Sequence, residues 1–225
     1  MHPLSGDLEK GLHGLQLVLS EEQQMQLLAY MDLIAKWTKV YNLTAVRDAH
    51  EMLTHHLLDS LAVIAPLRRE LTKLALPEVA VVPYQAQTTC SLLDVGAGAG
   101  LPGIVIAISC PDVSVTCVDT VAKKAAFIQQ VAATLRLPNL KGLHARVESL
   151  TQPYDVVCAR AFASLVDFTT WSQPALAPHG IWMAMKGKHP HEELAALPEY
   201  AHVFHVEQLQ VPGLDAERCI VWMHG

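Results

Sequence analysis

The chain has 225 residues, of which 51% are hydrophobic and 17% charged, and its formal net charge is −6. This composition excludes wholesale disorder and is typical of one globular domain with a smaller additional unit. The sequence contains neither an apolar run of the ~18 residues that cross a bilayer nor the pattern of a secretory signal. We therefore expect a soluble, cytoplasmic protein without membrane contact.

Apolar residues recur at helical spacing over residues 1–66. Ser20 and Gln23 have the spacing of a capping box, which predicts the start of a helix. A later periodic run begins at Leu53, and Pro66 is expected to end it. This part of the chain is therefore predicted to be an N-terminal helical unit of about three helices.

Residues 67–90 show no clear period and are predicted to be a connecting segment. From residue 91 onward, short runs rich in Val and Ile alternate with helical stretches such as 121–136. The predicted strands are 91–96, 113–119, 143–148, 154–161, 180–187, 202–211 and 218–224. Such alternation predicts a mostly parallel, seven-stranded sheet covered on both faces, and the last two strands read as a terminal antiparallel pair. Residues 91–225 are thus expected to form an α/β domain.

A glycine-rich loop lies between the first predicted strand and the helical run that follows it. Gly96, Gly98, Gly100 and Gly103 allow the backbone to turn sharply and to approach a ligand closely. The last three also satisfy the dinucleotide fingerprint, so the loop alone leaves NAD and other nucleotide-like cofactors open.

Two carboxylates near this loop narrow the choice of cofactor. Asp119 ends the next strand, where it can accept hydrogen bonds from ribose hydroxyls. Asp94 lies inside the strand before the glycines, where a buried carboxylate needs a cation or several donors. S-adenosylmethionine (SAM) carries a sulfonium and an ammonium group. The pattern Asp94-x-Gly96-x-Gly98-x-Gly100 resembles the first motif of class I SAM-dependent methyltransferases, which have a Rossmann-like fold.

The residues near the fourth strand limit which classes of methyl acceptor are possible. Methyltransferases of exocyclic amines usually carry [N/D]-P-P-[Y/F] there, and C5-cytosine enzymes carry a cysteine beside a proline; this chain has neither pattern. Cys158 is therefore expected to be a core residue. The five scattered cysteines predict buried free thiols, and the histidine pairs lack a third ligand at a familiar spacing, so no metal is expected.

Almost the whole chain closely resembles one family, ribosomal RNA small subunit methyltransferase G, also called glucose-inhibited division protein B. The matching stretches are KWTKVYNLTAVRD (36–48), HHLLDSL (55–61), LLDVGAGAGLPGI (92–104), ARVESL (145–150), CARAFASL (158–165), MKGK (185–188) and LQVPGLDAERCIV (209–221). The resemblance implies SAM-dependent methylation of N7 of one guanine in the 530-loop region of 16S ribosomal RNA. The partner would be this RNA or the 30S subunit, and no protein partner is evident.

The resemblance also assigns residues. It implies cofactor contacts by Gly96 and Leu101 in the loop, Asp119 at the ribose, Val147 and Glu148 beside the adenine, and Arg160 near the reacting end.

Arg160 and Lys186 are the candidate catalytic residues. The Arg160 guanidinium suits guanine O6 or a phosphate, but it could equally hold the cofactor carboxylate or pair with Asp94 or Glu148. Lys186 ends the fifth strand, at the edge where open α/β sheets bind ligands, although a solvated lysine is the alternative.

The expected chemistry needs no general base. Guanine N7 has a lone pair and no proton, so in-line transfer of a methyl group depends on orientation, which can supply ~7 to 11 kcal/mol of the barrier. Residues 91–190 carry a net positive charge, and the candidate RNA contacts are Lys123, Lys124, Arg146, Lys188 and Arg218. An NAD-linked oxidoreductase, a non-catalytic SAM-binding assembly factor and a small-molecule methyltransferase are the alternatives.

Overall fold

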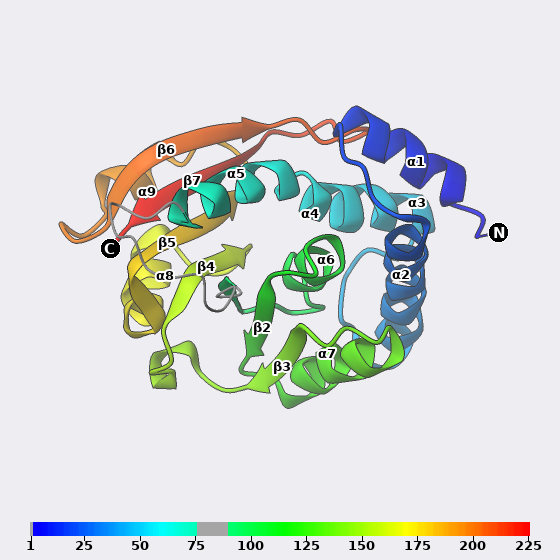
Figure 1. The fold of residues 1–225 in the computed structure, drawn as a ribbon, viewed down its shortest axis with the longest axis horizontal. Coiled ribbons are helices and arrows are strands. Elements are labelled where there is room, and N and C mark those ends of the chain that lie inside the picture. The colour runs from blue at the N-terminus through cyan, green and yellow to red at the C-terminus, as the bar shows by residue number, and fades with distance from the viewer. Residues whose placement is uncertain (1, 76–89) are drawn as a thin grey trace, which may run out of the picture.

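The computed structural model describes residues 2–75 and 90–225, and within them it forms a seven-stranded sheet (Figure 1). The strand order is β3-β2-β1-β4-β5-β7-β6. The strands are β1 (Ser91–Val95), β2 (Ser114–Asp119), β3 (Leu140–His144), β4 (Tyr154–Arg160), β5 (Leu176–Lys186), β6 (His202–Leu209) and β7 (Arg218–His224). The first five strands pair in parallel, and β7 is antiparallel to both β5 and β6. This confirms the predicted sheet and its terminal antiparallel pair.

One strand lies earlier than predicted. The sequence placed the third strand at residues 143–148, but β3 ends at His144, which is paired with Asp119 at the last position of β2. Residues Val147–Ser149 form a short 3-10 helix instead. The prediction was wrong because β3 can pair with β2 only as far as β2 extends. The apolar side chain of Val147 is buried, but Val147 does not belong to a strand.

The N-terminal segment is helical, as predicted. Its elements are α1 (Ser5–Gly14), α2 (Glu21–Tyr41), α3 (Ala49–Met52), the π-helical segment η1 (Leu53–Leu58), α4 (Asp59–Leu61) and α5 (Ile64–Ala75). The capping box of α2 is confirmed: Ser20 Oγ accepts from the backbone N–H of Gln23 at 3.2 Å, and Gln23 Oε1 accepts from that of Ser20 at 2.9 Å.

The expected helix end at Pro66 was wrong. The helix that precedes it already ends at Leu61, and Pro66 lies in the first turn of α5. A proline is tolerated there because the N–H groups of the first turn have no intrahelical partner. Helix α5 therefore extends into the predicted connecting segment as far as Ala75, and residues 76–89 of that segment lie outside the described residues.

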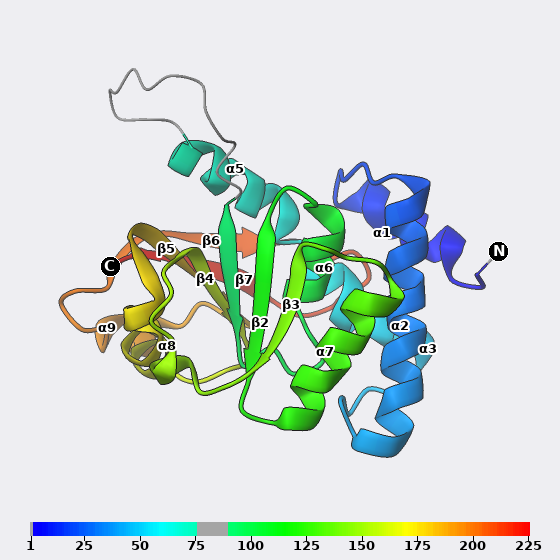
Figure 2. The ribbon, with the colours of Figure 1, turned by 60° about the horizontal axis from the view of Figure 1, so that its bottom comes forward.

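Helices cover both faces of the sheet (Figure 2). On one face, α6 (Gly103–Ser109) and α7 (Ala122–Thr134) lie beside α2, and α8 (Leu165–Ser172) and α9 (His191–Ala195) lie on the other. The Trp37 ring of α2 is 5.3 Å from that of Phe127 in α7. Tyr30 donates its hydroxyl hydrogen to the Ala99 carbonyl at 2.7 Å. The N-terminal helices thus share a core with the sheet and pack directly behind the glycine loop.

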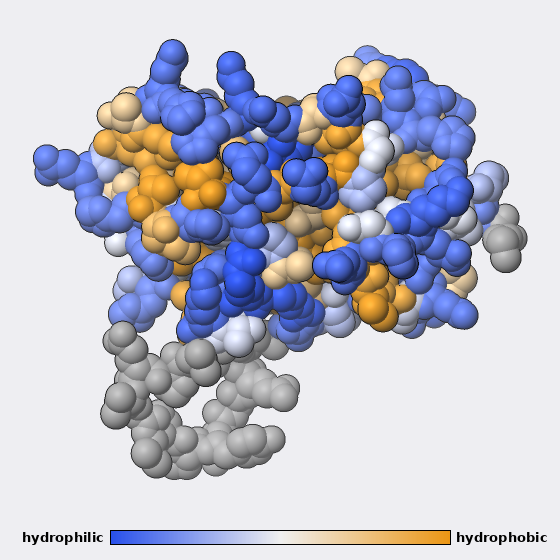
Figure 3. Space-filling view, turned by 90° about the horizontal axis from the view of Figure 1, so that it is seen from above, coloured by the Kyte–Doolittle hydropathy of each residue, from blue (hydrophilic) through white to orange (hydrophobic). Residues whose placement is uncertain are grey.

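Apolar side chains remain exposed on β6, the edge strand of the sheet. Figure 3, which views the molecule from above Figure 1, shows apolar areas separated by hydrophilic side chains. Val203 and Phe204 of β6 are exposed.

Among residues 2–75 and 90–225, no helix combines the length and the apolar character that a membrane crossing requires.

The cysteine prediction is confirmed for four of the five residues, since Cys90 is only partly buried. All five cysteines are free thiols, and Cys158 is fully buried in β4. Burial raises the pKa of the Cys158 thiol well above its ordinary value, which suits a core residue and not a nucleophile. The described residues contain no group of three potential ligands that could hold a metal ion.

Candidate cofactor and substrate site

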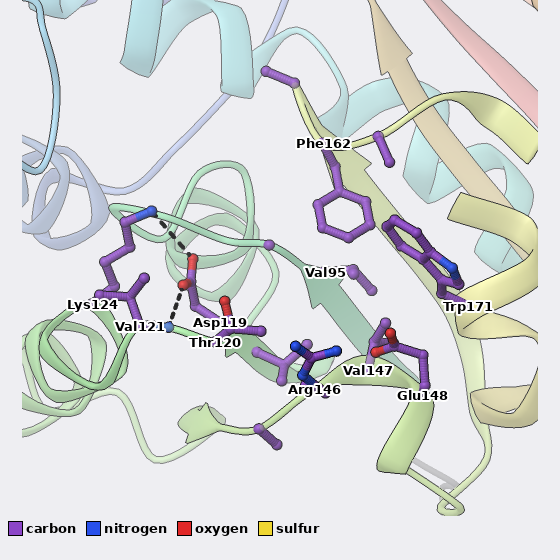
Figure 4. A pocket seen from close by; sticks show the side chains of 15 residues that line it. Val95, Asp119, Thr120, Val121, Lys124, Arg146, Val147, Glu148, Phe162 and Trp171 are labelled. Atoms are coloured by element: carbon purple, nitrogen blue, oxygen red, sulfur yellow. Dashed lines mark hydrogen bonds and ion pairs between the residues drawn. The ribbon is translucent and has the colours of Figure 1, made fainter. Parts of the chain in front are cut away.

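A pocket of about 530 Å³ lies at the carboxyl ends of β1, β2 and β4 (Figure 4). Open parallel sheets bind ligands at this edge, and the volume is within the ~300–1,000 Å³ of small-molecule sites. We call it the strand-end pocket. It is lined by Val95, Gly96, Val118, Asp119, Thr120, Val121, Lys124, Ala145, Arg146, Val147, Glu148, Ala161, Phe162, Ala163 and Trp171.

The glycine loop borders the strand-end pocket through Gly96. Gly96 has a φ of +65° and Gly100 a φ of +88°, a backbone region that residues with a side chain rarely adopt. A Cβ atom on Gly96 would collide with the Phe162 ring, and one on Gly100 would collide with Ile104. The loop therefore needs glycine both for its backbone conformation and for space, as the sequence predicted.

Asp119 links the loop to the next strand. The residue is 5% exposed, and its Oδ2 accepts from the backbone N–H of Gly98 at 3.0 Å, while Oδ1 accepts from that of Val121 at 2.8 Å. Lys124 Nζ lies 3.6 Å from Oδ2. A carboxylate has about four acceptor positions, so Asp119 can still accept from a ligand hydroxyl inside the pocket.

Asp94 lies beneath the loop and does not line the strand-end pocket. Its Oδ2 accepts from the backbone N–H of Gly103 at 2.8 Å, which joins the end of β1 to the first turn of α6. Its Oδ1 is buried without a hydrogen-bond partner among the described residues. Burial raises the pKa of this carboxyl from 3.8 to about 7, against the lowering effect of Gly103 and Arg160. The charged form of Asp94 is therefore only partly compensated within the described residues, and a cationic partner for it stays a prediction.

The rim of the pocket combines charged and aromatic side chains. Arg146, Val147 and Glu148 follow β3 on one side, and Phe162, just after β4, and Trp171 in α8 face them. The two aromatic rings meet edge to face, with centroids 5.9 Å apart, and both are more than a third exposed. Sequence reasoning missed these two residues; an apolar Phe162 between small residues, directly after a strand, was the available signal.

Arg160 and Lys186 end neighbouring strands but do not line the strand-end pocket. Arg160 Nη1 donates to Asp59 Oδ2 at 2.8 Å and to the His55 carbonyl at 3.0 Å. Among the described residues, Arg160 thus forms its ion pair with Asp59, and not with Asp94 or Glu148 as the sequence had allowed. Lys186 Nζ lies 2.8 Å from Glu193 Oε2 and also donates to the Ala163 carbonyl at 3.3 Å. Lys186 is therefore not a freely solvated lysine.

The other predicted residues are dispersed around this edge. Lys124 and Arg146 line the pocket, Lys123 lies 5.2 Å above the Tyr41 ring, and Lys188 is exposed beyond β5. Arg218 Nε donates to Asp59 Oδ1 at 2.7 Å. Of the predicted loop residues Gly98, Gly100 and Leu101, none lines the pocket, and Leu101 is buried in the core. Asp59, which binds two of the predicted arginines, was missed.

Comparison with solved structures agrees with this arrangement. The chain superposes on TrmN from Thermus thermophilus with a TM-score of 0.54 at 18% identity, covering 77% of this chain and 53% of that one. It superposes on a SAM-dependent methyltransferase from Aquifex aeolicus with a TM-score of 0.51 at 16% identity, covering 73% and 92%. With the glycine loop and Asp119 at the ends of β1 and β2, the fold defines a class I SAM-dependent methyltransferase.

The family follows from the sequence comparisons. The family model described as rRNA small subunit methyltransferase G matches residues 23–221. Ribosomal RNA small subunit methyltransferase G of Polaromonas sp. (strain JS666) is 69% identical over 96% of this chain and 92% of its own length, and that of Acidovorax sp. (strain JS42) is 63% identical over 96% and 93%. The chain belongs to the rRNA small subunit methyltransferase G family. This confirms the predicted family, fold and SAM cofactor and excludes the NAD-linked alternative.

Proposed function

We propose that this chain transfers a methyl group from SAM to N7 of one guanine in the 530-loop region of 16S ribosomal RNA. The observation that carries the proposal is the strand-end pocket, which joins an end that contains Gly96 and Asp119 to an aromatic rim open to solvent. The family membership supports an RNA acceptor, and the resemblance described above supports N7 of guanine. We further expect the reaction to take place in the cytoplasm, on the rRNA itself or on the 30S subunit.

The fit of SAM rests on residues that line the pocket and on the glycine loop beside it. Bound SAM supplies a methyl group on a positively charged sulfur. Gly96, Gly98, Gly100 and Leu101 form the loop against which its amino-acid part would lie, with the unpartnered oxygen of Asp94 beneath. Asp119 would accept from the ribose hydroxyls, and Val147 and Glu148 would lie beside the adenine.

The pocket lining favours transfer by orientation without a general base. Its titratable residues are Asp119, Lys124, Arg146 and Glu148, and both oxygens of Asp119 already accept backbone hydrogen bonds. Because N7 of guanine carries no proton, no base is required. The Phe162 and Trp171 faces can instead hold a flat base beside the glycine loop, since aromatic stacking tolerates any base.

The basic residues have two proposed roles. Arg160 and Lys186 are anchored at the ends of β4 and β5, next to the wall formed by Ala161 and Ala163, where they can position the acceptor. The proposed RNA contacts around the pocket are Lys123, Lys124, Arg146, Lys188 and Arg218. We also propose a methyltransferase domain at residues 91–225, preceded by a helical unit whose last helix, α5, passes the predicted boundary at residue 66 and reaches Ala75.

The direct test is methyl transfer from labelled SAM to small subunits that lack the modification, followed by mass spectrometry of 16S rRNA fragments. We expect one N7-methylguanine in the 530-loop region. Arg160→Ala should lose transfer at least 100-fold while the protein stays folded, and Arg68→Ala, which removes an arginine paired with Asp112, should remain active. Labelling of a different nucleotide, or transfer to small molecules without RNA, would refute the proposal.

A further inference from the structure

A carboxylate of α9 contacts both the end of β5 and the start of α8. Glu193 Oε2 lies 2.8 Å from Lys186 Nζ and accepts from the backbone N–H of Leu165 at 2.7 Å, and Oε1 lies 3.1 Å from the same lysine nitrogen. Lys186 Nζ also donates to the Ala163 carbonyl at 3.3 Å. The Glu193 and Lys186 side chains are 34% and 19% exposed, so water only partly screens these contacts. Together they hold one short segment of the chain at two points.

This segment is the turn between β4 and α8, residues 161–164, which we call the β4–α8 turn. Its first residue, Ala161, has a φ of +49°, a left-handed conformation that a side chain disfavours. Such a backbone persists only where the surrounding structure holds it, and it is typical of functional sites. The contacts at Ala163 and Leu165 follow two and four residues after Ala161 and fix the end of the turn.

The β4–α8 turn carries Phe162, whose ring packs against the glycine loop. A Cβ atom on Gly96 would collide with this ring. The ring also meets Trp171 of α8 edge to face, and Phe162 is still 37% exposed. Phe162 therefore lies beside the loop expected to hold SAM and remains accessible to an incoming base.

The start of α8 has a cap of its own. Ser164 is the N-cap residue, and its hydroxyl oxygen accepts from the backbone N–H of Asp167 at 3.1 Å. A carboxylate near a helix N-terminus is stabilising, but capping alone requires no lysine. Glu193 instead joins the first N–H of α8 to Lys186 at the end of β5, and so connects the turn to the sheet.

We propose that Glu193 is a positioning residue for methyl transfer, which fixes the β4–α8 turn through Lys186 and Leu165 and thereby places Phe162 against the acceptor base. The inference rests on the proposed function, in which Phe162 and Trp171 hold the guanine. Glu193 does not line the strand-end pocket, so it acts through the turn and not by contact with cofactor or base. Its loss slows the transfer itself, because small errors in orientation raise the barrier, and leaves SAM binding unchanged.

Substitutions of Glu193 test this role. Glu193→Ala should lower kcat for unmethylated small subunits about tenfold, with unchanged SAM affinity by calorimetry. Glu193→Gln keeps an oxygen for the Leu165 N–H but removes the charge beside Lys186, so it should lower kcat only about threefold. Glu192→Gln is the matched control, because it removes the same charge from the exposed neighbour on α9 and should keep full activity. Thermal unfolding verifies that each variant is folded, and Glu193→Gln, the milder change, decides the matter if Glu193→Ala is not.

A double-mutant cycle with Phe162 shows where Glu193 acts. Effects of independent residues multiply, whereas those of residues that act through one another do not. If Glu193 acts by placing Phe162, Glu193→Gln should slow transfer no further in a Phe162→Ala protein. Single-turnover measurements keep this slow reaction within range. If Glu193 served Lys186 alone, Glu193→Gln would slow the Phe162→Ala protein as much as it slows the unaltered one.

Three results would overturn the inference: full activity of both folded Glu193 variants, a loss of SAM affinity in Glu193→Gln, or an undiminished effect of Glu193→Gln in the Phe162→Ala protein. Failure of the proposed function is distinguishable from these. If the unaltered protein methylated another nucleotide, and Glu193→Gln slowed that transfer only while Phe162 was present, the function would be wrong and the positioning role would stand.

Discussion

The buried carboxyl of Asp94 makes the stability of this protein depend on pH. Its pKa is raised from 3.8 to about 7, chiefly because burial penalises the charged form. Between pH 3.8 and about 7, the folded protein therefore keeps a proton on Asp94 that the unfolded chain has released. At 1.36 kcal/mol for each pH unit, this difference corresponds to about 4 kcal/mol.

The sign follows from the proton count. The stability linked to Asp94 is fully present below the unfolded pKa of 3.8, and it is lost as the pH rises through about 7. Asp94→Asn removes the titration but keeps a carbonyl oxygen that can accept from Gly103. The free energy of unfolding of Asp94→Asn minus that of the unaltered protein should consequently rise by about 4 kcal/mol between pH 4 and pH 8.

Urea unfolding at several pH values measures this difference, since groups that titrate equally in both proteins cancel. Asp112→Asn is the control. Asp112 is exposed, and the hydrogen bond from Arg68 lowers the pKa of its carboxyl below the ordinary value of 3.8. The stability that this carboxylate contributes is therefore lost only as the pH falls below 3.8. Its difference from the unaltered protein should be flat from pH 5 to pH 8. If the Asp94→Asn difference were equally flat, Asp94 would not hold a proton near neutral pH and the reasoning would fail.

Two further substitutions test the loop itself. Asp119→Ala removes the acceptor of two backbone N–H groups and should lower the free energy of unfolding by about 2–4 kcal/mol and SAM affinity by more than tenfold in calorimetry, with Asp119→Asn intermediate. Equal SAM affinity in all three proteins would remove Asp119 from the cofactor site. Gly96→Ala places a side chain at a φ of +65° and against Phe162, and should reduce stability by about 1–2 kcal/mol and weaken SAM binding. Gly187→Ala, whose Cβ would meet nothing within 4 Å, should match the unaltered protein, and a Gly96→Ala variant as stable as this control would contradict the requirement for glycine.

Much of the fold was predictable because the signals are local. A capping box, a change of apolar period and a cluster of glycines act over a few residues, and the capping box of α2, the order of strands and helices, and the positive φ angles of the loop all agree with them. The misplaced third strand and the misread Pro66 show the limit of such signals. Where a strand stops depends on its neighbour, and a proline fits the start of a helix as well as the end of another.

The amino-acid sequence by itself determined that a glycine-rich turn follows a buried strand, because the positive φ angles of Gly96, Gly98 and Gly100 strongly favour glycine. Only the tertiary structure decided that Arg160 and Arg218 meet at Asp59, residues that are 101 and 159 positions away from it along the chain. It also placed Phe162 and Trp171 across the pocket from Glu148. Side chains brought together by different strands and helices share no spacing in the sequence, so their contacts become visible only once the sheet has folded.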